Sequence, residues 1–123
     1  MSDDVWILGI RMTKFGKHPD KDTVDLASEA ALAALADGGV TMKDIGVLAA
    51  GCLMQANAGI GQQLQKQIGQ TGIPVYNVAN ACATGATALR TVIILCKTGS
   101  CTATAPRVVA VASWACSQPA SAA

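Results

Sequence analysis

The chain has 123 residues, of which 51% are hydrophobic and 3% aromatic, and its formal net charge is +1. This length predicts one domain with a sizeable buried core. Because the lysines and arginines are scattered and form no basic stripe, the composition excludes nucleic acid and an anionic membrane surface as expected partners. We expect a small ligand or another protein instead.

The cysteines and the start of the chain indicate a reducing compartment. Five cysteines, no Cys-x-x-Cys pair and a single histidine favour neither a disulfide framework nor a metal site. The opening MSDDVWILG lacks the basic segment of a signal peptide, and no apolar run reaches the roughly 18 residues of a membrane span. We therefore expect a cytoplasmic protein without a membrane span.

The first third of the chain predicts a strand, a loop and a helix. The apolar, β-branched run VWILGI (5–10) is typical of a buried strand, and the basic stretch after it favours a loop. Asp22 or Thr23 is a suitable N-cap for the next helix, and Gly38-Gly39 is a C-terminal signal. Alanines at three- and four-residue spacing between these signals predict a closely packed helix.

The middle of the chain repeats the strand and helix pattern. The runs GVLAAGCLM (46–54) and PVYNVA (74–79) predict two more buried strands, and a glycine-hinged loop between them leads into a short amphipathic helix. A third helix is expected from Cys82 to about Lys97. Alternating helices and strands, with the strands apolar on both faces, predict an α/β fold around a mostly parallel sheet.

The stretch NVANACATGATALR (77–90) places Cys82 where the third strand ends and a helix begins. In open α/β folds, ligands bind at this carboxyl edge of the sheet. A thiol in the first turn of a helix lies near unsatisfied N–H groups and the positive end of the helix dipole, which favour the thiolate. The four residues after Cys82 are small and leave room for an acyl chain or for close backbone packing. Cys82 is therefore a candidate nucleophile, and a buried structural cysteine is the alternative.

Four motifs in this order resemble a known family. NACATGATAL is similar to the nucleophilic-cysteine motif of the thiolase superfamily, in the form of its sterol-carrier and lipid-transfer branch. Residues 5–35 resemble the first strand, basic loop and first helix of that branch. Residues 44–78 resemble its second strand, its Gly-x-Gly-Gln loop and the strand into the cysteine. The resemblance, in register from about Val5 to Arg90, implies a partial thiolase-like N-terminal lobe of the acetyl-CoA acetyltransferase kind.

The resemblance implies acyl transfer in fatty-acid or sterol side-chain metabolism, with acyl-CoA and 3-ketoacyl-CoA thioesters as substrates and no bound cofactor. Cys82 would be the catalytic nucleophile that accepts the acyl group, dividing one difficult cleavage into two transfers. The segment Gly59-Ile60-Gly61-Gln62 would lie near the active site and dimer interface. A thiolase also uses a later histidine and a second cysteine, which this chain lacks, so the fragment is expected to be inactive alone. The only histidine, His18, is expected to be a solvated loop residue.

Two alternatives to an acyltransferase fragment stay open. One is a non-catalytic thiolase-like remnant that binds a lipid or a partner subunit. The other is a condensing enzyme of the ketoacyl-synthase type, whose cysteine motif is also rich in small residues. The sequence leaves acyl chain length and reaction direction open, and the expected protein partner is a second copy of the chain or a complementing subunit.

The sequence divides into residues 1–96, the thiolase-like N-terminal fragment, and residues 97–123, a diverged or frame-shifted tail. All eight acidic residues lie at or before Asp44. The run PRVVAVASWA resembles the next strand of the family, but Ser113-Trp114-Ala115 stands where the family has a Gly-x-Glu-x-Met pattern. An abrupt shift to Cys, Ser, Ala and Pro is also what a changed reading frame in GC-rich DNA produces.

Several residues outside the cysteine motif are expected to be structural. Cys52 and Cys96 are predicted to fill the core, Trp6 and Trp114 are predicted to pack, and Cys101 and Cys116 receive no role. The half-lobe would leave a strand edge and an apolar helix face uncovered, so the isolated chain is expected to associate.

Overall fold

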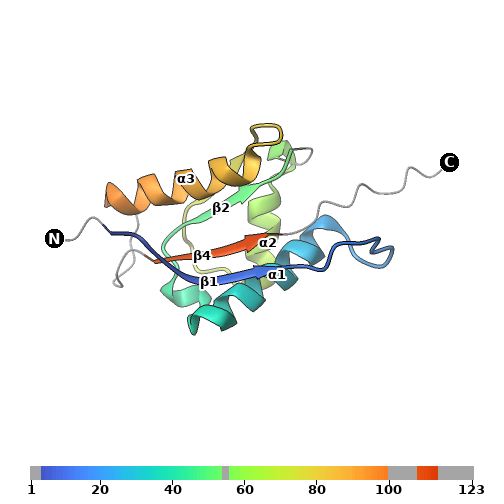
Figure 1. Ribbon diagram of the computed structural model, residues 1–123, viewed down its shortest axis with the longest axis horizontal. Helices are drawn as coiled ribbons and strands as arrows, with labels where there is room; N and C mark the ends of the chain where they lie inside the picture. The colour runs from blue at the N-terminus through green and yellow to red at the C-terminus, as the bar shows by residue number, and fades with distance from the viewer. Residues whose placement is uncertain (1–3, 54–55, 100–107, 114–123) are drawn as a thin grey trace.

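Strands and helices alternate along the chain in the computed structural model, which describes residues 4–53, 56–99 and 108–113 (Figure 1). The elements are β1 (Trp6–Met12), α1 (Thr23–Gly38), β2 (Leu48–Gly51), α2 (Ile60–Ile68), β3 (Val75–Val78), α3 (Thr84–Lys97) and β4 (Val108–Ser113), with single 3₁₀ turns at Met42–Asp44 and Ala56–Ala58. The expected order of three strands and three helices is confirmed. Cys101, Trp114 and Cys116 lie outside the described residues.

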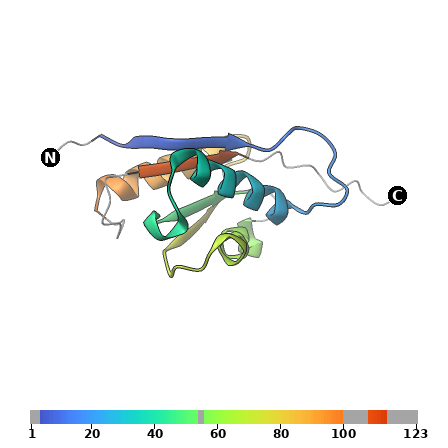
Figure 2. The same cartoon turned by 90° about the horizontal axis from the view of Figure 1, so that it is seen from below.

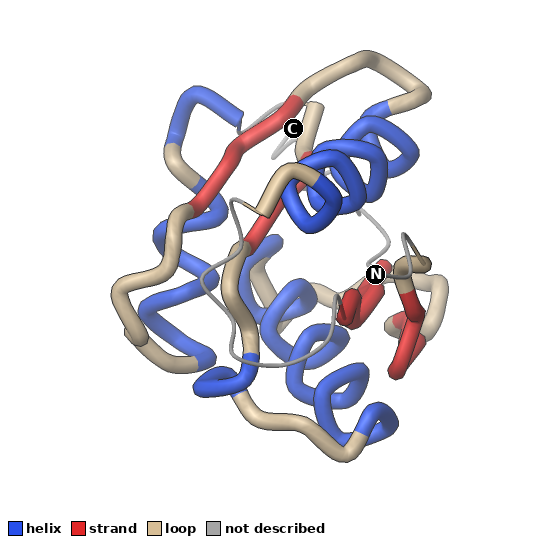
Figure 3. The backbone as a smooth tube through the Cα atoms, turned by 90° about the vertical axis from the view of Figure 1, so that its left-hand side faces the viewer, coloured by secondary structure: helices blue, strands red, loops and turns tan. Residues whose placement is uncertain are grey.

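All described strand pairs are parallel, as expected for an α/β fold. The strands form two pairs: β2 lies beside β3, with Leu48 opposite Val75, and β1 lies beside β4, with Trp6 opposite Val108. The register of the second pair shifts between Ile7 and Gly9. Helices α1 and α3 lie on opposite sides of the strands (Figure 1 and Figure 3).

Local signals delimit α1 as the sequence predicts. The Asp22 side chain accepts a hydrogen bond from the Asp25 N–H at 2.7 Å, and the Asp22 N–H donates to the Asp25 carboxylate at 3.1 Å. This reciprocal capping box satisfies N–H groups that the first turn leaves without helical partners. At the other end, Gly39 adopts the left-handed conformation, with φ of 65°, which a glycine reaches at little cost.

The core lies between α1, α2 and the end of β2. Its central cluster consists of Val24, Ala50, Cys52 and Ile60. Cys52 and Cys96 are each only 4% exposed, which confirms that both fill the interior. The core is therefore built mainly from helix α1 and the second strand rather than from the first strand.

The expectation that the first strand is buried is wrong. Trp6 is 62% and Ile10 61% exposed, and the prediction that Trp6 packs is wrong as well. Among the described elements β1 contacts mainly α1 and β4, and Figure 2 shows it along an outer edge of the molecule. Gly9 is its buried residue, because an added Cβ there would lie 2.1 Å from the Ala34 carbonyl oxygen. An apolar strand is buried only where another layer covers it, and no described element covers the outward side chains of β1.

Candidate functional site

Cys82 lies beyond the carboxyl end of β3, in the connection to α3. The carboxyl ends of β2 and β3 meet here, because the strands are parallel and the Cys52 N–H donates to the Val78 carbonyl at 3.2 Å. The Cys82 side chain is exposed, whereas Cys52 and Cys96 are buried. The position matches the expected sheet edge, and the alternative of a buried structural cysteine is wrong for Cys82.

Helix α3 begins two residues later than expected, so Cys82 precedes the helix instead of lying in its first turn. Ala83 is the N-cap and Thr84 the first helical residue. A tight turn precedes them, in which the Ala83 N–H donates to the Asn80 carbonyl at 2.9 Å and the Thr84 N–H donates to the Ala81 carbonyl at 3.2 Å. Ala81 has a φ of 45°, which takes the backbone out of the helical region just before Cys82.

Three polar side chains organise this turn, a role that the cysteine motif did not predict. The Asn80 N–H donates to Oγ1 of Thr84 at 2.8 Å, and that hydroxyl donates to the Ala81 carbonyl at 2.7 Å. The Asn80 side-chain amide donates to Oγ1 of Thr87 at 3.0 Å. An asparagine followed by threonines four and seven positions later, at a strand-to-helix junction, was the available signal, since such side chains bond to nearby backbone in turns.

A close approach to β2 anchors the start of α3. A Cβ added at Gly51 would lie 2.8 Å from Cγ2 and 3.1 Å from the carbonyl oxygen of Thr84. Thr84 is 8% exposed, so its methyl group is buried while its hydroxyl reaches the turn. The last residue of β2 therefore has to be small for the cysteine turn to sit where it does.

The segment Gly59-Ile60-Gly61-Gln62, expected to be a loop, is instead the start of α2. Gly59 adopts a left-handed φ of 67° at the N-cap, and α2 begins at Ile60. The Gly61 N–H donates to Oδ1 of Asn77 at 2.7 Å, and Nδ2 of Asn77 donates to Oε1 of Gln62 at 2.7 Å. The segment is thereby held against β3, the strand that leads to Cys82.

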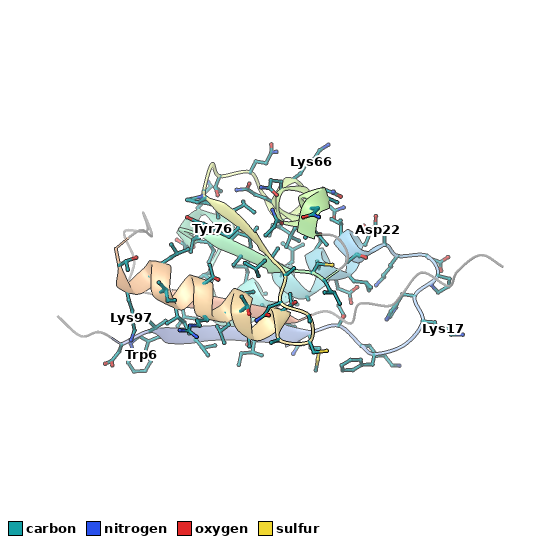
Figure 4. All side chains as sticks on the ribbon, turned by 90° about the horizontal axis from the view of Figure 1, so that it is seen from above. Trp6, Lys17, Asp22, Lys66, Tyr76 and Lys97 are labelled. Carbon is teal, nitrogen blue, oxygen red and sulfur yellow. The ribbon has the colours of Figure 1, made fainter. Side chains whose placement is uncertain are left out.

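His18 lies in the loop after β1, as expected, but it is half-buried and not fully solvated. Its ring nitrogen Nε2 lies 2.8 Å from the Lys14 carbonyl oxygen, so Nε2 carries the proton and donates it. Figure 4 shows its neighbour Lys17 far out on this loop, at the opposite end of the molecule from Trp6. The ring therefore has a partner within its own loop.

Within the part of the chain that the structure describes, no group of three histidine, cysteine or acidic side chains lies close enough to hold a metal ion. None of the helices described there is both long and apolar enough to cross a membrane.

Comparisons with known proteins agree with this arrangement. The N-terminal domain family of the thiolases matches residues 5–106. Sterol carrier protein 2 from Gallus gallus is 41% identical over 92 residues, which are 72% of this chain and 17% of that protein. The non-specific lipid-transfer protein-like 2 from Caenorhabditis elegans is 40% identical over 88 residues, 69% of this chain and 21% of that protein. The chain thus spans about a fifth of the length of these relatives.

An enzyme and two solved structures extend the likeness. The acetyl-CoA acetyltransferase of Methanothermobacter thermautotrophicus is 35% identical over 101 residues, 78% of this chain and 26% of that protein. The 3-oxoacyl-(acyl carrier protein) synthase III of Xanthomonas oryzae superposes with a TM-score of 0.57 at 22% identity, covering 67% of this chain and 25% of that one. A variant of OleA from Xanthomonas campestris superposes with a TM-score of 0.58 at 20% identity, covering 66% of this chain and 25% of that one. The structures support the fold, and the family match over residues 5–106 shows that the chain belongs to the thiolase family through its N-terminal domain.

Proposed function

We propose that this chain is the N-terminal part of a thiolase-type acyltransferase that acts on acyl-CoA and 3-ketoacyl-CoA thioesters in cytoplasmic lipid metabolism. Cys82 is its acyl-accepting nucleophile. One observation carries the proposal: the exposed Cys82 thiol stands on a tight turn at the shared carboxyl edge of β2 and β3. The match of the thiolase N-terminal domain across this turn supports the same reading.

The proposed reaction needs a thiolate at Cys82. The sulfur attacks the C3 carbonyl of a 3-ketoacyl-CoA, and the bond between C2 and C3 breaks. The acyl group stays on the sulfur as a thioester, while C2 takes up a proton and leaves as acetyl-CoA. The thiolate of free coenzyme A then attacks the acyl-enzyme, releasing the shortened acyl-CoA and restoring the Cys82 thiolate. Covalent catalysis of this kind divides one slow step into two faster ones.

The sequence contains one histidine, His18, whose Nε2 donates a hydrogen bond to the Lys14 carbonyl within its own loop. The base that removes the thiol proton is therefore expected from another part of the protein or from a complementing chain. General base catalysis contributes about 3 to 5 kcal/mol to a reaction of this type. An oxyanion hole contributes about 3 to 4 kcal/mol. With neither, the chain alone is expected to take up an acyl group slowly and not to turn over.

A second candidate function is a thiolase-like module that binds a partner subunit without catalysis. The exposed apolar side chains of β1 favour it, since exposed apolar surface marks protein interaction sites when it is extensive. The condensing-enzyme alternative shares the fold of the two solved neighbours.

Acylation of the full chain tests the proposal. The chain is incubated with acetyl-CoA and its intact mass is measured, with the linear peptide of residues 77–90 as the unfolded reference. We expect a single acetyl group on the wild type and on Cys96→Ala, absent from Cys82→Ala and released by hydroxylamine as a thioester is. The folded chain should react at least about tenfold faster than the peptide, because the turn presents the thiol.

The outcomes separate the candidates. No adduct, or a rate no greater than that of the peptide, would overturn the enzyme proposal and leave the partner-binding module.

A further inference from the structure

The turn before Cys82 contains an unfavourable backbone conformation. Ala81 has a φ of 45°, and among the described residues it is the one non-glycine residue with a positive φ. In this region the Cβ crowds the following carbonyl oxygen, so alanine adopts it only when surrounding contacts hold it there. Such strained residues persist where the neighbouring structure over-determines them.

One hydroxyl holds both sides of Ala81. Oγ1 of Thr84 accepts a hydrogen bond from the Asn80 N–H at 2.8 Å and donates one to the Ala81 carbonyl at 2.7 Å. The same carbonyl also accepts the Thr84 N–H at 3.2 Å. Since that carbonyl belongs to the peptide group that carries the N–H of Cys82, the hydroxyl orients the backbone of the cysteine itself.

Thr84 can do this because its own position is held. It is 8% exposed, it is the first residue of α3, and its methyl group faces the close approach at Gly51. The methyl group thus anchors the residue on β2 and the hydroxyl reaches the turn. Serine at this position keeps only the hydroxyl, and valine keeps only the methyl group.

We propose that Thr84 is a positioning residue for Cys82: its hydroxyl holds Ala81 in the left-handed conformation and so sets how the thiol is presented. The inference rests on the proposed function only in treating Cys82 as the reacting group. The hydrogen bonds and the strained residue exist whether or not the chain transfers acyl groups.

The first test is the alkylation of Cys82 by iodoacetamide in the folded full chain. The sulfur displaces iodide, and a proton and iodide are released. Thr84→Val should slow the reaction at least about fivefold, because a loosened turn no longer orients the thiol. Thr84→Ser should stay within about twofold of the wild type. Thr91→Val is the matched control, because the Thr91 hydroxyl donates to the Thr87 carbonyl at 2.8 Å within α3 and leaves the turn untouched.

Rates are taken well below the melting temperature of each variant, so that loss of folding is measured separately. Failure of serine to rescue the rate, or a valine variant within twofold of the wild type, would overturn the proposal.

The second test uses Ala81→Gly and does not depend on reactivity. Glycine tolerates a positive φ, so Ala81→Gly should raise the melting temperature by about 4 °C in the wild type and in Thr91→Val. In Thr84→Val the turn is free to relax, and the gain should vanish. An equal gain in all three backgrounds would contradict the positioning role of the Thr84 hydroxyl.

The two proposals fail differently. If the variants show the expected iodoacetamide rates but acetyl-CoA acylates none of them, the acyltransferase proposal is overturned and the positioning role of Thr84 stands. If Thr84→Val is acylated as fast as the wild type, the positioning role is overturned and the acyltransferase proposal stands.

Discussion

The side-chain oxygen of Asn77 accepts a hydrogen bond from the Gly61 N–H at 2.7 Å, so the strand that leads to Cys82 is tied to the first turn of α2. An N–H group in the first turn of a helix has no partner within the helix, and here the neighbouring strand supplies one. The Gly-x-Gly-Gln segment and the cysteine motif, separate in the sequence, are thus parts of one arrangement.

Substitution of Gly61 by alanine is expected to destabilise the fold. An added Cβ would lie 2.5 Å from Cγ1 of Val75 and 2.9 Å from Oδ1 of Asn77. Overpacking of this kind typically costs about 1 to 3 kcal/mol of unfolding free energy. Urea denaturation measures it, with Gly85→Ala as the control. Gly85 lies in α3 with nothing within 4 Å of an added Cβ, so that variant should gain about 0.5 to 1 kcal/mol. Equal effects of the two variants would contradict the packing described.

Loss of the Asn77 side chain is expected to cost more than loss of its exposed partner. Asn77→Ala leaves the buried Gly61 N–H without an acceptor, which costs about 1 to 3 kcal/mol. Gln62→Ala removes only the second hydrogen bond of the Asn77 amide, at an exposed residue, and should cost under about 1 kcal/mol. Urea denaturation of both variants checks the order, and a reversed order would be inconsistent with the network.

Asp44 is expected to make the free energy of unfolding depend on pH in the acidic range. The N–H and hydroxyl of Thr41 donate to its carboxylate at 2.8 and 2.9 Å, and these hydrogen bonds lower the pKa of Asp44 below its ordinary value of 3.8. A carboxyl whose pKa is lowered by folding stabilises the native state above its unfolded pKa, and this contribution disappears as the pH falls through the folded pKa. Asp44→Asn should therefore be less stable than the wild type near neutral pH.

The stability difference between Asp44→Asn and the wild type should shrink to nothing as the pH falls below the folded pKa of Asp44. Urea melts across the acidic range measure it. Glu29→Gln is the control for the loss of an exposed carboxylate elsewhere in the chain. Glu29 lies in α1 and pairs with Lys21, so this variant leaves the hydrogen bonds from Thr41 to Asp44 in place. A difference for Asp44→Asn that stays constant down to the lowest pH would argue against the pKa shift.

The exposed apolar side chains of β1 are expected to drive self-association of the isolated chain. The large ones are Trp6, Ile7, Leu8, Ile10 and Met12. Ile10→Lys should lower the associated fraction seen by size exclusion with light scattering, because a charge interrupts the apolar surface. Leu32→Lys adds the same charge at a residue of α1 that is 50% exposed and should change it less. A monodisperse wild-type monomer would refute the expectation.

The sequence predicted the features that depend on neighbours along the chain. The N-cap at Asp22 and the stop at Gly38-Gly39 follow from hydrogen bonds that span only a few residues. The order of elements and the place of Cys82 after the third strand follow from apolar runs and from the resemblance of its motif. These signals depend on residues that are close together in the sequence, so they can be recognised without the folded structure.

The tertiary structure decided the rest. The burial of β1 depends on which layers cover it, and the late start of α3 depends on Thr84, whose methyl group is seated against Gly51 of a distant strand. The amino-acid sequence by itself determined the caps of α1, the order of elements and the cysteine motif, since these rest on contacts within a few residues. The exposure of β1, the contact of Thr84 with Gly51 that anchors the turn, and the hydrogen bond between Asn77 and Gly61 arise only when segments far apart in the chain meet.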